Sequence, residues 1–253
     1  MPRLAREISG SGIYHIMMRG INRQAIFIDE EDCKKFIKTL EQYKEKCGYE
    51  IYAYCLMGNH LHLLLKVGGE PLDQIMRRIC GSFVYWYNLK YNRTGYLFQD
   101  RFKSETVEND AYFLTVLRYI HQNPVKAGIS DKVEDYKWSS YCEYTNKPKL
   151  VDIFFALNMF NSNQEKALEL FIKHSRETKE DSCLDNEEKN RLTDEEAKNV
   201  INQNYKMKSA TDLQGLDIIT RNMILKQLKQ KHGLTIRQIE RITGIGRGAI
   251  FKA

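Results

Sequence analysis

Two histidines separated by one residue form the first pattern in this chain that could do chemistry. His60 and His62 stand in the run HLHLLLK, whose residues favour a β-strand. Successive side chains of a strand point to opposite faces, so both imidazoles leave one face while Leu61 leaves the other. Two imidazole nitrogens on one face can bind a single metal ion without distorting the backbone. Such a pair is more often made of surface or hydrogen-bonded histidines, so alone it does not establish a site.

A tyrosine and an asparagine form a second pair, in RYIHQNPVKAG. Tyr119 and Asn123 are four residues apart near the end of an expected helix, which places a phenol and an amide oxygen on one helical face. Taken alone, the pair is more simply interpreted as a packed tyrosine and an asparagine that ends the helix before Pro124.

Basic and aromatic residues are interleaved in a third pattern, RRICGSFVYWYNLKYNRTGYLFQDRFK. It holds six basic residues against Asp100 alone: Arg77, Arg78, Lys90, Arg93, Arg101 and Lys103. Cations neutralise phosphates and aromatic faces stack on unpaired bases, a combination that suits single-stranded nucleic acid more than duplex. An equally good interpretation makes most of the aromatic residues helix core and the charges a solvated face.

These patterns require strands and helices that bring them together. Residues 12–20 and 49–69 are β-prone, and the second run is divided by Gly58-Asn59, which suits an antiparallel hairpin turn.

Three helices are expected in the same part of the chain. Apolar spacing predicts helices over 29–47 and 71–91, and a third from Asp110, as N-cap, to the stop at Pro124. The order strand, helix, two strands, helix, helix predicts an α+β fold: a ferredoxin-like antiparallel sheet with the helices on one face.

The rest of the chain is expected to form a connector and a small basic unit. Residues 146–210 are helical in pattern and more polar, and the acidic stretch 176–196 indicates a linker or a solvated connector. In residues 211–253, HGLTIRQIERITGIGRGAIFKA has the pattern of a helix-turn-helix. The predicted domains are therefore 1–145, 146–210 and 211–253.

Charge is concentrated in that last unit. Residues 217–253 hold eight Lys or Arg against two acidic residues, which accounts for the whole net charge of +6. A basic unit of two short helices favours contact with duplex DNA, through Arg237, Arg241 and Arg247, over a mere cap on the fold.

Composition excludes several classes of protein. The 253 residues are 42% hydrophobic, and no apolar run approaches the roughly 20 residues that span a bilayer. The first residues, MPRLAREISG, carry charge where a signal peptide would be apolar. Six scattered cysteines indicate neither a zinc ribbon nor a disulfide framework. A cytoplasmic protein without membrane contact is expected.

Together, the motifs resemble the single-tyrosine transposases with a His-hydrophobic-His (HUH) pair, the IS200-like group. Within that group the chain is most similar to the REP-associated tyrosine transposases. The resemblance covers about residues 1–145 and lies in MPRLAREISGSGIYHIMMRGINRQAIF, YCLMGNHLHLLLK, GYLFQDRFKSETV and RYIHQNPVKAG. The IS200 group more often has Gln at the place of Asn123, whereas Asn matches the REP-associated branch.

The resemblance implies a metal-dependent strand-transfer reaction. By similarity, His60, His62 and Asn123 would bind Mg²⁺ or Mn²⁺, although these ligand types also admit Zn²⁺. Tyr119 would attack a phosphodiester of single-stranded DNA, forming a 5′-phosphotyrosine and releasing a 3′-hydroxyl that can later rejoin strands. His15 and His121 match neither ligand position and are not counted as ligands.

The resemblance also implies the partners. Palindromic single-stranded hairpins and their flanking DNA are the expected substrates, and a monomer is favoured over the homodimer of the smallest HUH transposases. The expected DNA contacts are Arg19, Arg77, Arg78, Arg101, Lys103, Arg237, Arg241 and Arg247. Two other functions stay open: a DNA-binding regulator without catalysis, and a metal-dependent nuclease in which water attacks and Tyr119 only packs.

Overall fold

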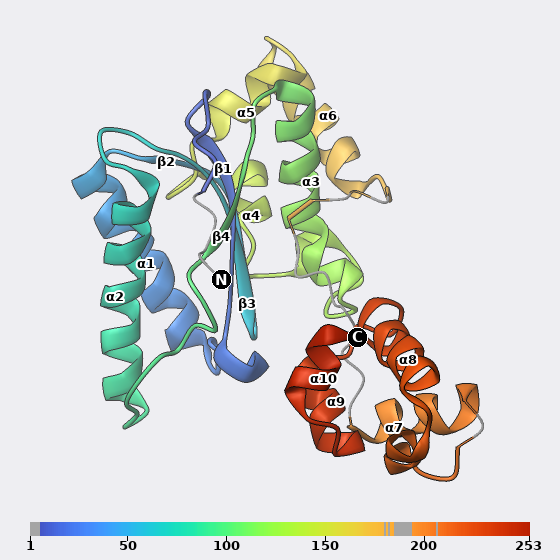
Figure 1. The fold of residues 1–253 in the computed structure, drawn as a ribbon. Helices are drawn as coiled ribbons and strands as arrows, with labels where there is room; N and C mark the ends of the chain where they lie inside the picture. Colours follow the sequence, from blue (N-terminus) through green and yellow to red (C-terminus); the bar gives the residue numbers. More distant parts are fainter. Residues whose placement is uncertain (1–5, 180, 182, 185–193, 206) are drawn as a thin grey trace. The chain divides into compact units, whose positions relative to one another are not determined.

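The chain forms two compact units, residues 1–185 and 186–253, each with its own hydrophobic core (Figure 1). The computed structural model describes residues 6–179, 181, 183–184, 194–205 and 207–253. The linker expected over 176–196 lies largely outside the described residues.

A four-stranded antiparallel sheet forms the centre of the first unit. Its strands lie in the order β2-β3-β1-β4 and comprise β1 (Ile13–Arg19), β2 (Glu50–Met57), β3 (His60–Lys66) and β4 (Lys103–Thr106). Helices α1 (Glu30–Cys47) and α2 (Leu72–Lys90) give the β-α-β-β-α-β order of the ferredoxin-like motif. The sequence pattern missed β4, because KSET is short and polar.

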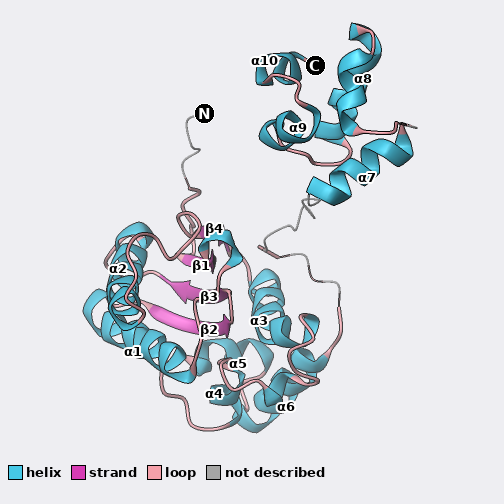
Figure 2. Ribbon diagram, turned by 90° about the horizontal axis from the view of Figure 1, so that it is seen from below, coloured by secondary structure: helices cyan, strands magenta, loops and turns pink. Residues whose placement is uncertain are grey.

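Helices cover both faces of this sheet, and the prediction of helices on one face is wrong. Figure 2 shows α1 and α2 on one side of the sheet and α3 (Asp110–Lys126), which contacts β2 and β3, on the other. Residues of β3 explain this arrangement. Leu61 and Leu63 face one side, His62 and Leu64 face the other, and all four are buried. A strand that is apolar on both sides must be covered on both sides.

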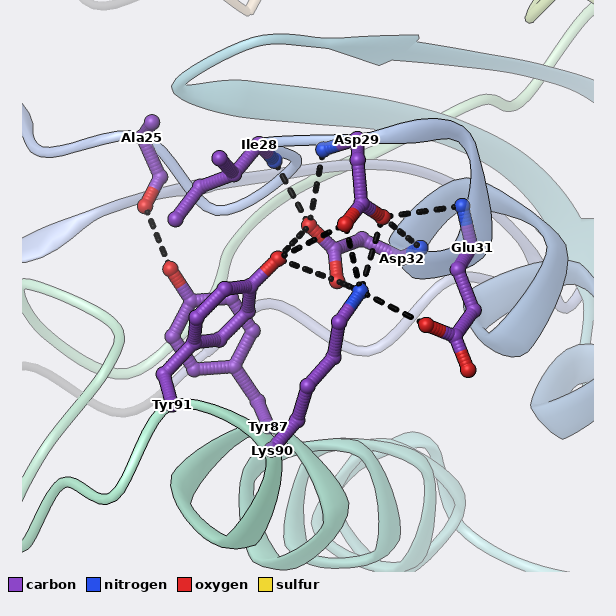
Figure 3. A network of polar contacts seen from close by, with 8 residues as sticks. All are labelled: Ala25, Ile28, Asp29, Glu31, Asp32, Tyr87, Lys90 and Tyr91. Carbon is purple, nitrogen blue, oxygen red and sulfur yellow. Dashed lines mark hydrogen bonds and ion pairs between the residues drawn. The ribbon is translucent and has the colours of Figure 1, made fainter.

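A polar network joins the start of α1 to the end of α2 (Figure 3). Asp29 caps α1 by accepting from the backbone N–H groups of Glu31 and Asp32. Lys90 pairs with Asp29, Glu31 and Asp32 at 2.7, 3.0 and 2.9 Å, and Tyr91 donates to the buried Asp32. Part of the basic and aromatic segment therefore holds two helices together.

Other aromatic side chains of that segment divide between the core and the surface. Phe83 and Tyr87 are fully buried, whereas Tyr85 and Tyr96 are 71% and 84% exposed. The core interpretation is thus confirmed for Phe83 and Tyr87, while nucleic-acid contact by the exposed residues stays a prediction.

Helix α3 continues past the proline that was expected to end it. Asn109 caps its start by accepting from the N–H of Tyr112, one residue before the predicted cap. Pro124 donates no hydrogen bond, yet the N–H of Ala127 still bonds to the carbonyl of Asn123 at 3.0 Å, and the helix ends at Lys126.

Three further helices complete the core of the first unit, and the last two lie where the sequence predicted the beginning of a connector. They are α4 (Tyr141–Thr145), α5 (Ile153–Phe160) and α6 (Gln164–Arg176), with a 3₁₀ turn over Val133–Asp135 before them. Phe171 of α6 is buried and stacks on Tyr144, with ring centroids 4.3 Å apart. Helix α5 is almost entirely apolar, and α6 buries Ala167 and Phe171 at a spacing of four, so both helices pack into the core.

The second unit is helical. It contains α7 (Asp194–Asn204), a 3₁₀ turn (Ala210–Gly215), α8 (Ile218–Gln230), α9 (Ile236–Thr243) and α10 (Arg247–Lys252). Thr235 caps α9, and Gly244 ends it with a left-handed φ of 72°. Helices therefore form where the sequence places them. In the described part of the chain, no helix is long and apolar enough to cross a membrane.

Candidate active site

Strand β3, which carries the two histidines, packs against α3. Strands β1 and β3 pair so that Arg19 lies opposite His60, and His15 leaves the same face of the sheet as His62. Tyr119 of α3 contacts His62 and His15. Its ring centroid is 5.6 Å from that of His62 and 5.8 Å from that of His15, and the tyrosine is 4% exposed.

Asn123 approaches His60 from α3. The Oδ1 atom of Asn123 lies 3.5 Å from Nε2 of His60, while Nδ1 of His60 lies 2.8 Å from Oδ1 of Asn59. Both amide oxygens can only accept, and the shorter contact, to Asn59, places the proton of a neutral His60 on Nδ1 and a lone pair on Nε2. Two acceptor atoms, one nitrogen and one oxygen, therefore face each other, as the ligands of a cation do.

His62 offers a further nitrogen. The residue is fully buried, its Nδ1 atom lies 3.0 Å from Nε2 of His15, and its Nε2 atom has no hydrogen-bond partner among the described residues. Burial, together with the neighbouring His15 and His60, holds the pKa of His62 well below its ordinary value, and burial lowers the pKa of His15 to about 3. Both rings are neutral at pH 7, as metal ligation requires.

The donor set fits a divalent cation. His60 Nε2, His62 Nε2 and Asn123 Oδ1 offer two nitrogens and one oxygen, a mixture that Mg²⁺, Mn²⁺ and Zn²⁺ accept. Over the described ranges, no group of three or more His, Cys, Asp or Glu residues could hold a metal. The candidate site therefore depends on the amide of Asn123 as its third ligand.

Sequence reasoning missed two neighbours of this site. Nζ of Lys126 lies 4.9 Å from the centroid of the Tyr119 ring. The positions of Tyr119, Asn123 and Lys126 follow i, i+4, i+7, a spacing that signals one helical face and could have revealed the lysine. Asn59, which fixes the proton of His60, stood in the hairpin turn and was interpreted only as a turn residue.

Comparison with known proteins assigns this arrangement to a family. Residues 9–123 match the model of the family described as "Transposase IS200 like", and the matched region includes both histidines, Tyr119 and Asn123. Residues 9–123, the part of the chain that carries the candidate site, thus match the IS200-like transposases. The resemblance drawn from the motifs is confirmed.

Two relatives connect this transposase with the REP-associated branch. A Haemophilus influenzae protein whose name places it among the REP-associated tyrosine transposases is 24% identical over 154 residues, covering 56% of this chain and 86% of the relative. The solved structure of a REP-associated tyrosine transposase bound to a REP hairpin is 21% identical. The match covers 60% of this chain and 90% of the solved chain. Its TM-score is 0.51, so the two proteins share a fold.

The two other histidines considered in the sequence have different places in the transposase. His15 lies within the site, although outside the donor set. His121 lies outside it: its Nε2 atom is 2.9 Å from Oγ of Ser140, and its ring packs edge-on against Tyr144 and Phe171.

The cations predicted to bind DNA divide between the two faces of the sheet. Arg19 is the cross-strand neighbour of His60, and Lys103 of β4 pairs with Met17, so both leave the histidine face. Arg77 and Arg78 of α2 are exposed and pair with Asp73 and Glu70 at 3.2 and 3.1 Å. Of the cations that were predicted in the first unit, Arg19 and Lys103 therefore lie on the histidine face.

A cavity of about 1030 Å³ lies on the opposite face, beside α2. Tyr14 and Met18, which alternate with His15 and Met17 along β1, form part of its wall. Its aromatic walls and cationic residues include Tyr96, Phe98, Phe102, Arg6, Arg77 and Arg101. The guanidinium of Arg6 lies 3.6 Å from the centroid of the Phe102 ring.

Two of the three arginines singled out in the second unit form ion pairs there. Nη2 of Arg241 lies 2.6 Å from Oδ1 of Asp194, and Arg247 pairs with Glu240. Both arginine side chains stay more than 60% exposed. These pairs cost little to break, because exposed ion pairs contribute about 0 to 1 kcal/mol.

Proposed function

We propose that this transposase cleaves and rejoins single-stranded DNA at hairpin sites through a covalent link to Tyr119. The observation that carries the proposal is the place of Tyr119, on α3 and across from the two histidines, with ring centroids 5.6 Å apart for Tyr119 and His62. Hairpins are the first substrates to test, because the solved relative of the same fold is described as bound to a REP hairpin.

His60, His62 and Asn123 would hold Mg²⁺ or Mn²⁺. When bound, the cation supplies positive charge that polarises a non-bridging oxygen of the scissile phosphate. The protein orients the imidazoles: Asn59 holds a proton of His60 on Nδ1, and burial holds the pKa of His62 well below its ordinary value.

The hydroxyl oxygen of Tyr119 attacks the phosphorus atom. A bond forms between that oxygen and phosphorus, the bond from phosphorus to the 3′-oxygen breaks, and a 5′-phosphotyrosine and a 3′-hydroxyl result. The phenol loses its proton and the departing 3′-oxygen gains one. The ammonium group of Lys126, 4.9 Å from the ring centroid, favours the negative charge that develops on the phenol oxygen. Attack by a 3′-hydroxyl on the same phosphorus reverses the reaction and rejoins DNA.

The remaining cations would hold the DNA around this site. Arg19 and Lys103, on the histidine face, suit phosphates that flank the scissile bond. The cavity beside α2, with Arg77 and Arg101 among its lining residues, suits the foot of the hairpin or its flanking strand, because it joins aromatic walls to positive charge. Arg78, also on α2, would contact the same DNA.

The second unit would contact duplex DNA as a helix-turn-helix module, through Arg237, Arg241 and Arg247. Its positive charge supports that role. A monomer would then carry both DNA-binding surfaces on one chain.

A gel experiment tests the proposal. End-labelled single-stranded hairpins are incubated with Mn²⁺ and either the wild-type protein, Tyr119→Phe or Tyr85→Phe, in which the changed tyrosine is 71% exposed on α2. We expect a slow-migrating covalent adduct with the wild type and with Tyr85→Phe, and none with Tyr119→Phe or after chelation of the metal. Cleavage that survives Tyr119→Phe would point to a water-activating nuclease. Binding without cleavage or adduct would point to a regulator.

A further inference from the structure

We infer that His15 is a positioning residue that fixes the ligand tautomer of His62. The inference rests on the proposed metal site and adds a residue outside its donor set. His15 would accept a hydrogen bond from the Nδ1–H group of His62 and so leave the Nε2 lone pair of His62 for the cation.

The contact between the two rings is short and enclosed. Nε2 of His15 and Nδ1 of His62 are 3.0 Å apart, and both residues are fully buried. The rings come from paired strands, with centroids 5.2 Å apart. Water cannot replace this contact without opening the sheet, so the two histidines must satisfy each other.

Only one of two proton arrangements permits ligation. Two imidazole nitrogens 3.0 Å apart form one hydrogen bond, so a single proton lies between Nε2 of His15 and Nδ1 of His62. If His15 donates, His62 carries its own proton on Nε2 and has no lone pair there. If His62 donates, its Nε2 atom is free to bind, and His15 carries its proton on Nδ1.

The unpartnered atoms are the same in both arrangements, so the bound cation is what selects between them. Nε2 of His62 and Nδ1 of His15 both lack a hydrogen-bond partner in the described part of the chain. Ligation would satisfy the first atom and select the tautomer in which the second carries a proton. His60 differs, because its partner Asn59 presents an oxygen that can only accept. His15 therefore gives the site a partner whose proton position changes when the cation binds.

Metal affinity measures this role directly. Isothermal titration of the full-length protein with Mn²⁺ would compare the wild type with His15→Phe, which keeps the ring volume but cannot accept, and His15→Gln, whose side-chain oxygen can accept near the position of Nε2. Loss of the partner of a metal-bound histidine typically lowers metal affinity about 10- to 100-fold. We expect a loss of that size for His15→Phe and recovery to within about threefold of the wild type for His15→Gln.

Nitrogen-15 NMR of the histidine rings supplies a readout that needs no variant. With Mg²⁺ bound to the wild type, His15 should show its proton on Nδ1 and His62 its proton on Nδ1. A metal-saturated protein in which His15 is protonated on Nε2 would overturn the inference, as would a folded His15→Phe variant with wild-type affinity.

A His62→Ala control separates this inference from the proposed metal site. If the wild type binds no Mn²⁺, or if His62→Ala binds it as well as the wild type does, the metal site itself is wrong. If His62→Ala loses binding while the His15 variants and the His15 tautomer show no effect, the metal site stands and the role of His15 fails.

Discussion

The proton positions of the site histidines in this transposase depend on the residues next to them. His60 is partly exposed and takes its proton position from Asn59, whereas His62 is fully buried and depends on His15. The proton position of each of these two histidines, which are two residues apart on one strand, thus depends on a different neighbour. Tyr119 lies against both His62 and His15 and meets the ammonium group of Lys126 on its ring face.

The lysine beside the nucleophile can be tested alone. Lys126→Gln removes the positive charge 4.9 Å from the Tyr119 ring centroid and keeps most of the side-chain length. We expect adduct formation at saturating DNA to slow about threefold to tenfold, since a cation–π contact at an exposed site contributes about 0.5 to 1 kcal/mol and charge on the phenol oxygen adds to it. Lys132→Gln, an exposed lysine in the same unit, is the control. Equal rates for both variants would remove Lys126 from the mechanism.

The turn that follows β1 helps to position Asn59, the neighbour of His60. Gly20 follows β1, and its N–H bonds to the carbonyl of Asn59 at 2.9 Å, beside His60. A Cβ atom at Gly20 would lie 2.2 Å from the carbonyl oxygen of Gln24, so the turn admits only glycine.

Gly20→Ala should therefore disturb the turn that holds Asn59. We expect the free energy of unfolding to fall by about 1 to 3 kcal/mol, the usual cost of overpacking, measured by urea unfolding. Gly69→Ala, where nothing lies within 4 Å of the new methyl group, should change the free energy of unfolding little. Similar losses in both variants would mean that the close approach at Gly20 does not exist.

A buried ion pair anchors α3 next to the nucleophile. Nη2 of Arg118 lies 2.7 Å from Oδ1 of Asp181, and both side chains are less than 10% exposed. The hydrogen bond and charge of Arg118 hold the pKa of Asp181 below its ordinary 3.8. The stability that this pair contributes is present above the unfolded pKa and is lost as the pH falls through the lower, folded pKa.

Asp181→Asn tests that pH dependence. At pH 7 the variant should be less stable than the wild type by about 3 kcal/mol, the order expected for breaking a buried pair. The difference in free energy of unfolding should shrink at pH 3, where the wild-type carboxylate begins to protonate. Asp131→Asn, an exposed aspartate, should show no such pH-dependent loss. A difference for Asp181→Asn that stays constant between pH 7 and pH 3 would contradict the assignment.

The sequence predicts the features that depend on neighbouring residues, and it does not predict those that depend on contacts between distant segments. Helical spacing and the Gly58-Asn59 turn located β1 to β3 and α1 to α3, because periodicity and turn chemistry are local properties. The pairing of Tyr119 with Asn123 on one helical face followed from a spacing of four. The register of β1 against β3 did not follow, since it depends on contacts between distant segments. The sequence therefore showed His15 without showing that it meets His62.

Under the proposed function, catalysis belongs to the first unit of the chain and additional DNA contact to the second. Each unit has its own buried core, and the family match ends within the first. The second unit contributes the positive charge, so its effect should appear in binding to duplex DNA more than in the rate of the covalent step.

Arg237 offers a clean test of that division, because it is exposed on α9. Arg237→Ala should weaken duplex binding similarly for all sequences and reduce the slope of log affinity against log salt by about 1, measured by fluorescence anisotropy. Lys208→Ala, an exposed lysine of the same unit outside α8 to α10, is the control. An unchanged salt slope for Arg237→Ala would show that α9 does not contact phosphates.

The central claim is that Tyr119 becomes covalently bonded to DNA, and peptide mapping of the adduct tests it most directly. After incubation with a hairpin oligonucleotide and Mn²⁺, nuclease and trypsin digestion should leave a nucleotide on the peptide of residues 119–126, because Arg118 and Lys126 flank it as cleavage sites. Fragmentation should place the added mass on Tyr119. A nucleotide on any other tyrosine, or hairpin cleavage with no modified peptide, would contradict the account.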